Sequence, residues 1–100
     1  MKTTFKKEDN NLVMYFEGRL DTAAAPKTDQ EMKVLYDCEG HDIILDCTAL
    51  DYISSSGLRL FLSLLKVAKP KKSHVYITGL NDNLRQVFAM TGFTNLFEFK

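Results

Sequence analysis

The sequence predicts a single α/β domain, residues 1–100, with helices packed on a mixed β-sheet. The order of its expected elements is β-β-α-β-α-β-α-β, an opening hairpin followed by alternating helices and strands. A hairpin is antiparallel, whereas strands joined through helices become parallel by right-handed crossovers, so the sheet is expected to be mixed. The 100 residues, 45% of them hydrophobic, suffice for one compact core and are too few for two.

The hairpin consists of the first two strands, expected over Thr3–Lys7 and Leu12–Glu17. The four residues between them, Glu8-Asp9-Asn10-Asn11, form a polar turn whose residues tolerate left-handed backbone conformations. At Gly18-Arg19-Leu20-Asp21 the chain is expected to leave the sheet.

The first helix is expected to begin near Pro26, because proline suits the first turn of a helix. Gly40 is expected to end it. The residues spaced for its inward face are Thr28, Met32, Leu35 and Tyr36.

The third strand is expected over Ile43–Asp46, and the second helix runs from about Leu58 to Ala68. The stripe of this helix expected to pack on the sheet comprises Leu58, Phe61, Leu62, Leu65 and Ala68. Further apolar residues widen that stripe: Leu60, Leu64 and Val67. Two interpretations stay open, and they are compatible with each other. In one, the helix lies deep between the sheet and a neighbouring helix. In the other, Leu60 and Leu64 form part of an exposed apolar docking patch beside the serines.

The C-terminal part contains one more strand, one more helix and a closing strand. The strand is expected at Val75–Ile77, and Asn81 or Asp82 caps the helix that follows. Gly92 ends this helix, and the last strand is expected near Leu96–Phe99.

The charge balance excludes two classes of partner. Lysine plus arginine and aspartate plus glutamate each number 13, so no net field attracts nucleic acid or an acidic membrane surface. No segment has the apolar length needed to cross a bilayer, and Met1–Lys7 lacks the apolar core of a secretion signal. The protein is therefore expected in the cytoplasm, without direct nucleic-acid binding and without membrane insertion.

The two cysteines, Cys38 and Cys47, predict neither a metal site nor a disulfide. They are few, they lack C-x-x-C spacing, and a reducing cytosol disfavours a bond between them. Both are expected to be small buried hydrophobic residues. No other pattern indicates a cofactor.

Three consecutive serines, Ser54, Ser55 and Ser56, lie where the third strand gives way to the second helix. Free backbone N–H groups and the positive end of the helix dipole occur at such a junction, and they suit a capping hydroxyl or a phosphate. Taken alone, the serines are interpreted as an ordinary N-cap with redundant hydroxyls.

The residues around these serines resemble the switch motif of the anti-sigma factor antagonists, the bacterial members of the sulfate transporter and anti-sigma factor antagonist (STAS) domain family. In that motif a strand ends in Asp, a short turn contains an aromatic residue, and Asp-Ser-Ser/Thr-Gly-Leu follows. Here Asp46 ends the strand, Tyr52 is the aromatic residue, and Ser55 takes the position that a partner kinase phosphorylates. Ser56-Gly57-Leu58 completes the motif. Ser54 departs from it, since the family usually has Asp there, and this lowers the negative charge beside the acceptor.

The resemblance covers nearly the whole chain, because Gly18-Arg19-Leu20-Asp21 also looks like the family's Gly-x-Leu-Asp turn. It implies an anti-sigma factor antagonist that, when unphosphorylated, sequesters an anti-sigma factor serine kinase and so releases a sigma factor. A serine phosphatase would be a second partner. Asp21 is equally consistent with a turn or a helix start. The partner-binding residues that the resemblance implies are Asp21, Ser54, Ser55, Ser56, Gly57, Leu58 and Leu60.

An enzymatic use of the serines is disfavoured. Ser-His-Asp chemistry needs a histidine within hydrogen-bond reach, but His41 and His74 precede strands whereas the serines follow one. In a parallel sheet each histidine would lie roughly 10 to 15 Å from Ser55, at about 3.3 Å per residue. The protein is therefore predicted not to be an enzyme.

Two non-enzymatic alternatives to the phosphorylation switch stay open. One is a STAS adaptor that docks on another partner, such as a transporter ATPase subunit, without phosphoregulation. The other is a small-anion or nucleotide-binding module that uses the helix N-terminus.

Overall fold

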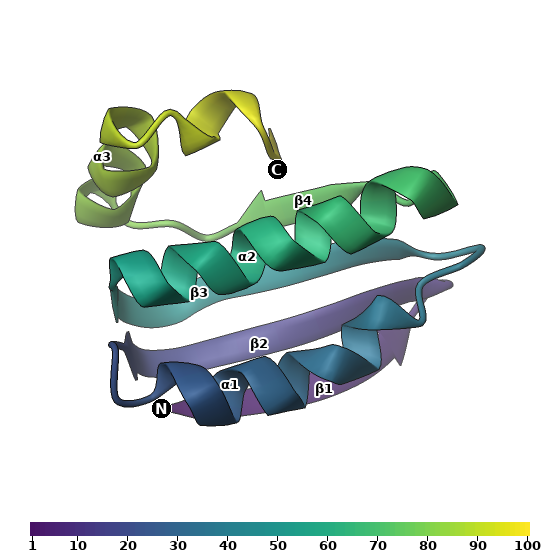
Figure 1. Ribbon diagram of the computed structural model, residues 1–100, viewed down its shortest axis with the longest axis horizontal. Coiled ribbons are helices and arrows are strands. Elements are labelled where there is room, and N and C mark those ends of the chain that lie inside the picture. Colours follow the sequence, from purple (N-terminus) through teal and green to yellow (C-terminus); the bar gives the residue numbers. More distant parts are fainter.

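The computed structural model describes residues 1–100 and contains one five-stranded sheet in the order β1-β2-β3-β4-β5. β1 pairs antiparallel with β2, and the other neighbours pair in parallel, which confirms the predicted α/β fold class with a mixed sheet (Figure 1). The strands are β1 (Lys2–Glu8), β2 (Asn11–Leu20), β3 (Asp42–Ile53), β4 (Val75–Thr78) and β5 (Glu98–Phe99). The helices are α1 (Ala25–Met32), α2 (Ser55–Ala68) and α3 (Asp82–Met90).

The helices and the sheet enclose the hydrophobic core. Figure 1 shows α1 and α2 lying across the same face of the sheet, with α3 toward the β4 side. Phe16 of β2, Phe61 of α2 and Phe88 of α3 are fully buried. Their ring centroids lie 5.3 Å apart for Phe16 and Phe61, and 6.4 Å apart for Phe61 and Phe88. Phe61 therefore joins the sheet to the third helix.

β2 and β3 are longer than predicted. β2 continues through Gly18–Leu20, where the chain was expected to leave the sheet. β3 continues past Asp46 to Ile53, through residues that were expected to form a turn. These two extensions pair with each other. Leu50 and Ile53 in the extension of β3 are buried, which favours the pairing. Two register shifts interrupt this pairing and hide the regular alternation that identifies a strand in a sequence.

The first of these shifts is a β-bulge in which Cys47 and Thr48 together oppose Phe16. The Thr48 N–H donates a hydrogen bond to Asp46 Oδ1 (3.0 Å). Gly79, which follows β4, has a φ of +81° and packs directly on the bulge. A Cβ at Gly79 would lie 2.7 Å from Thr48 N and 2.8 Å from Thr48 Cα. The bulge and the connection from β4 to α3 therefore fit together only without a side chain at Gly79.

Smaller differences concern the ends of other elements. α1 ends at Met32, and a 3-10 turn over Lys33–Tyr36 completes the segment that was expected to be one helix. The predicted inward residues Thr28, Met32 and Leu35 are buried there. Asn81 caps α3 by accepting a hydrogen bond from the Leu84 N–H (2.8 Å), as expected. The last strand has only two residues.

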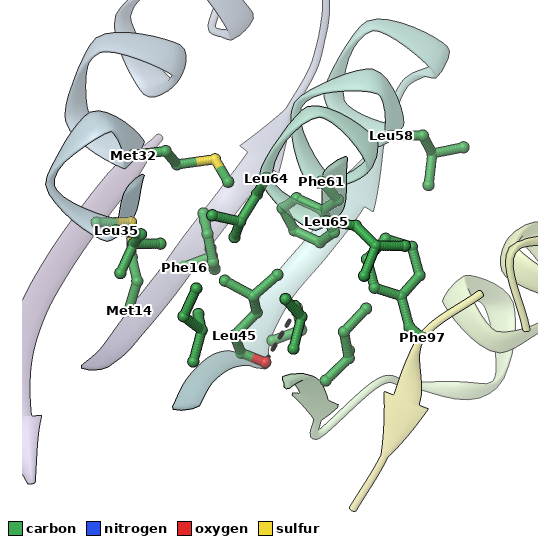
Figure 2. Packing of buried hydrophobic residues seen from close by; sticks show 14 of the residues in the cluster. Met14, Phe16, Met32, Leu35, Leu45, Leu58, Phe61, Leu64, Leu65 and Phe97 are labelled. Carbon is green, nitrogen blue, oxygen red and sulfur yellow. Dashed lines mark hydrogen bonds between the residues drawn. The ribbon is translucent and has the colours of Figure 1, made fainter. Parts of the chain in front are cut away.

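α2 lies deep, and one expectation about its surface is wrong. Leu64 has 0% exposure, so it forms no part of an exposed docking patch. Figure 2 shows Leu64 on the side of α2 that faces Met32 and Leu35, where α1 and the turn after it contact α2. Leu60 and Leu62 are half-buried. Part of the Leu60 side chain therefore remains at the surface. Leu62 was predicted to face the sheet, but its side chain is only partly buried.

Candidate functional site

Ser54 is the N-cap of α2 and is fixed by hydrogen bonds on both sides. It has an extended backbone and is only 8% exposed. Its Oγ accepts a hydrogen bond from the Gly57 N–H (3.2 Å), and its own N–H donates to the Leu20 carbonyl (2.8 Å). The hydroxyl of Ser54 is therefore engaged in the predicted cap. The serine loop, Ser54–Ser56, is held to the end of β2 by the bond to Leu20.

Ser55 and Ser56 occupy the first two positions of α2. Ser55 is exposed and Ser56 is half-buried, so Ser55 has the most accessible hydroxyl of the three serines. The first turn of α2 contains no acidic residue. The positive end of the helix dipole at Ser55 is therefore not compensated by a charge within that turn.

Gly57 and Leu58 support the serine loop from inside. A Cβ on Gly57 would lie 2.7 Å from Leu20 Cγ and 2.9 Å from Ile53 Cγ1, so glycine lets α2 begin very close to the ends of β2 and β3. Leu58 is 4% exposed and belongs to the core. Neither residue offers an exposed side chain, and their expected part in partner binding stays a prediction.

The end of β2 contributes two further groups beside the serine loop. Asp21 Oδ1 accepts a hydrogen bond from the Ala24 N–H (2.9 Å). Asp21 therefore has a structural role in the turn before α1, which was one of the roles expected for it. The Arg19 guanidinium lies over the ring of Tyr52, 4.4 Å from its centroid, and Tyr52 is 40% exposed. Sequence reasoning missed this cation–π pair, because it depends on the register that places Arg19 opposite Tyr52.

The histidines lie at the other end of the sheet. β3 and β4 are parallel, and both histidines come before the first residues of these strands. His41 Nδ1 lies 2.8 Å from the Asn10 carbonyl, and His74 Nδ1 lies 2.6 Å from Glu98 Oε2. Neither side chain is therefore placed to take a proton from Ser55.

The predicted burial of the two cysteines is confirmed. Cys38 and Cys47 are both fully buried. Burial, with a smaller contribution from the charge of Asp46, raises the pKa of the Cys47 thiol, so it stays protonated and unreactive at neutral pH.

No group of three or more His, Cys, Asp or Glu side chains is placed to hold a metal ion. None of the helices combines the length and the apolar character needed to cross a membrane.

The cap itself gives a stability prediction. Ser54→Ala is expected to lower the free energy of unfolding by about 0.5 to 2 kcal/mol, because the Gly57 N–H loses its acceptor. Ser54→Asp restores the residue usual in the switch motif and is expected to add about 0.3 to 1 kcal/mol, because a carboxylate caps and also compensates the helix dipole. Urea denaturation at low ionic strength measures both changes. A Ser54→Asp variant less stable than Ser54→Ala would contradict the cap assignment.

Comparison with known proteins extends the resemblance seen in the motif. The STAS domain family matches residues 2–100. The chain is 32% identical over 97 residues to BtrV of Bordetella bronchiseptica. This match covers 97% of this chain and 84% of BtrV. It is 27% identical over 95 residues to the anti-sigma-B factor antagonist of Listeria monocytogenes, covering 95% of this chain and 83% of that protein.

The solved structure of the Bacillus cell fate determinant SpoIIAA in its phosphorylated form has the same fold. It matches with a TM-score of 0.74 at 17% identity, over 99% of this chain and 91% of that chain. Anti-sigma factor antagonists are not enzymes, which agrees with the positions of the histidines. The chain belongs to the STAS domain family, and its relatives identify it as a protein of the anti-sigma factor antagonist type.

Proposed function

We propose that this protein is an anti-sigma factor antagonist controlled by phosphorylation of Ser55. Unphosphorylated, it binds an anti-sigma factor serine kinase in the cytoplasm and thereby frees a sigma factor. Phosphorylated, it releases the kinase, and a serine phosphatase returns it to the binding form. The observation that carries the proposal is the contrast between neighbouring hydroxyls: Ser55 is exposed at the start of α2, whereas the Ser54 hydroxyl is held in the cap.

Two relatives support the proposal. The Listeria protein is named for its antagonism of the anti-sigma-B factor, and SpoIIAA has been solved in a phosphorylated form. In this chain a kinase can reach Ser55 without opening the fold. The Ser54 side chain is buried, and its Oγ accepts the hydrogen bond from the Gly57 N–H, so phosphorylation of Ser54 would require breaking the cap.

The docking surface in this proposal is the exposed rim around Ser55. Its side chains are those of Asp21, Ser55, Ser56 and Leu60, with the Arg19–Tyr52 pair at the ends of β2 and β3. A phosphate brings about −1.5 to −2 charges to this rim. It weakens docking by repulsion and by the cost of removing its water, whereas the uncompensated helix N-terminus tolerates it within the folded domain.

A pull-down with the partner kinase tests the switch. Wild type and Ser55→Ala are expected to retain the kinase, and Ser55→Asp is expected to lose most of the binding, because the added carboxylate partly mimics the phosphate. Urea denaturation of each variant controls for folding. If Ser55→Asp bound the kinase as well as Ser55→Ala did, control by charge at this position would be ruled out.

Fragmentation mass spectrometry after incubation with the kinase and ATP tests the residue. The phosphate is expected on Ser55. Phosphate found only on Ser54 or Ser56 would move the site but keep the switch. No phosphate on any of the three, with a kinase active on another substrate, would favour a STAS adaptor without phosphoregulation.

A further inference from the structure

We propose that Arg59 receives the phosphate of phosphorylated Ser55 in an ion pair within α2. The inference rests on the proposed function, because it concerns the modified form of the same serine. It assigns Arg59 as the residue that positions the phosphate. The phosphate would then be held on the helix surface and not left free to turn into solvent.

The geometry follows from the helix. Ser55 is the first residue of α2 and Arg59 follows it by four positions, so the two side chains lie on one face, about 5 to 6 Å apart at their Cβ atoms. Side chains of a helix point back toward its N-terminus, which directs the long Arg59 side chain toward Ser55. Both residues are exposed, so the pair forms without displacing any part of the core.

Arg59 is also free to take this role. It makes none of the ion pairs or cation–π contacts in the protein. The other arginines are engaged, since Arg19 stacks on Tyr52 and Arg85 Nε donates a hydrogen bond to the Leu80 carbonyl (3.2 Å). A guanidinium presents two parallel N–H donors to a phosphate, which makes arginine a suitable partner for this modification.

The pair would give phosphorylation two effects on kinase binding, one at the docking rim and one at Arg59, a helical turn beyond Ser55. Before modification, Arg59 is a free cation available to an acidic group of the kinase. After modification, Arg59 is held by the neighbouring phosphate, so the kinase meets an added anion and loses a cation at the same time.

The test uses protein in which phosphoserine is inserted at position 55 during translation, so that it does not depend on the native kinase. The second pKa of the phosphate is followed by ³¹P NMR titration at low ionic strength. In the phosphoprotein, Arg59→Gln is expected to raise this pKa by about 0.2 to 0.7 unit, because the arginine favours the dianion. High salt should shrink the difference.

Two control variants separate this pair from other sources of positive charge. Arg19→Gln removes the arginine at the end of β2, next to the Leu20 carbonyl that accepts from Ser54. Lys66→Gln removes a cation of α2 that lies eleven residues, or about 16 Å along the helix, from Ser55. Both are expected to change the phosphate pKa less than Arg59→Gln does.

An unchanged pKa in Arg59→Gln, or an equal or larger change in either control, overturns the proposed pair. The same phosphoprotein offered to the kinase tests the switch separately. Kinase binding that survives phosphorylation refutes the proposed function, whatever the titration shows. If phosphorylation abolishes kinase binding but Arg59→Gln leaves the phosphate pKa unchanged, the switch is retained and the proposed role of Arg59 is refuted.

Discussion

Phe61→Ala is expected to lower the free energy of unfolding by about 3 to 5 kcal/mol. Phe61 has 0% exposure and its ring contacts the rings of Phe16 and Phe88, so truncation leaves a cavity where the sheet, α2 and α3 meet. Closing that cavity would require several elements to shift together, which the close packing of the core opposes. Urea denaturation monitored by circular dichroism measures the loss.

Leu60→Ala is the matched control on the same helix. Leu60 is half-buried and packs against the edge of the core, so its truncation is expected to cost below about 2 kcal/mol. The difference between the two variants separates core from surface along α2. Equal large losses would mean that Leu60 is fully committed to the core and would remove it from the docking rim.

Gly79→Ala is expected to destabilise the fold by roughly 2 to 5 kcal/mol. A non-glycine residue in the left-handed region costs about 1 to 2 kcal/mol, and overpacking adds about 1 to 3 kcal/mol. Both contributions apply here, because φ is +81° and the new Cβ would meet the backbone and Oγ1 of Thr48. Thermal or urea denaturation checks the prediction.

Gly40→Ala isolates the backbone contribution to that loss. Gly40 has a φ of +80°, but apart from its two chain neighbours no residue comes within 4 Å of the position that a Cβ would take, so its replacement is expected to cost only about 1 to 2 kcal/mol. Thr48→Ala in the Gly79→Ala background is expected to recover a minority of the loss, since the clash with Thr48 N and Cα persists. A Gly79→Ala variant no less stable than Gly40→Ala would show that the bulge moves aside freely.

The fold was predictable because each element has a local signal in the sequence. Helix starts at Pro26 and Asn81 and the apolar run before Asp46 all fall where the structure has the corresponding elements. The lengths of β2 and β3 were not predictable. Their last residues pair across two register shifts, and a bulge breaks the two-residue alternation from which a strand is inferred.

The site was predictable in its serines and less so in its surroundings. The capping role of Ser54 follows from a local rule about helix starts, and the structure confirms it. The burial of Leu64 depends on where α1 and the turn after it pack, and the Arg19–Tyr52 pair depends on strand register. Both features depend on tertiary structure, which the helical or alternating pattern of a single segment does not predict.

The edges of the sheet bear on self-association. β1 is an edge strand of seven residues, long enough to template another chain, and β5 at the opposite edge has only two. The formal net charge is zero, so general repulsion between copies is weak. Lys2, Lys6 and Lys7 are exposed along β1, and charged lysines on an edge strand disfavour its pairing with another chain. At the β1 edge, resistance to edge-to-edge aggregation therefore depends on the lysines of this strand and not on the overall charge of the protein.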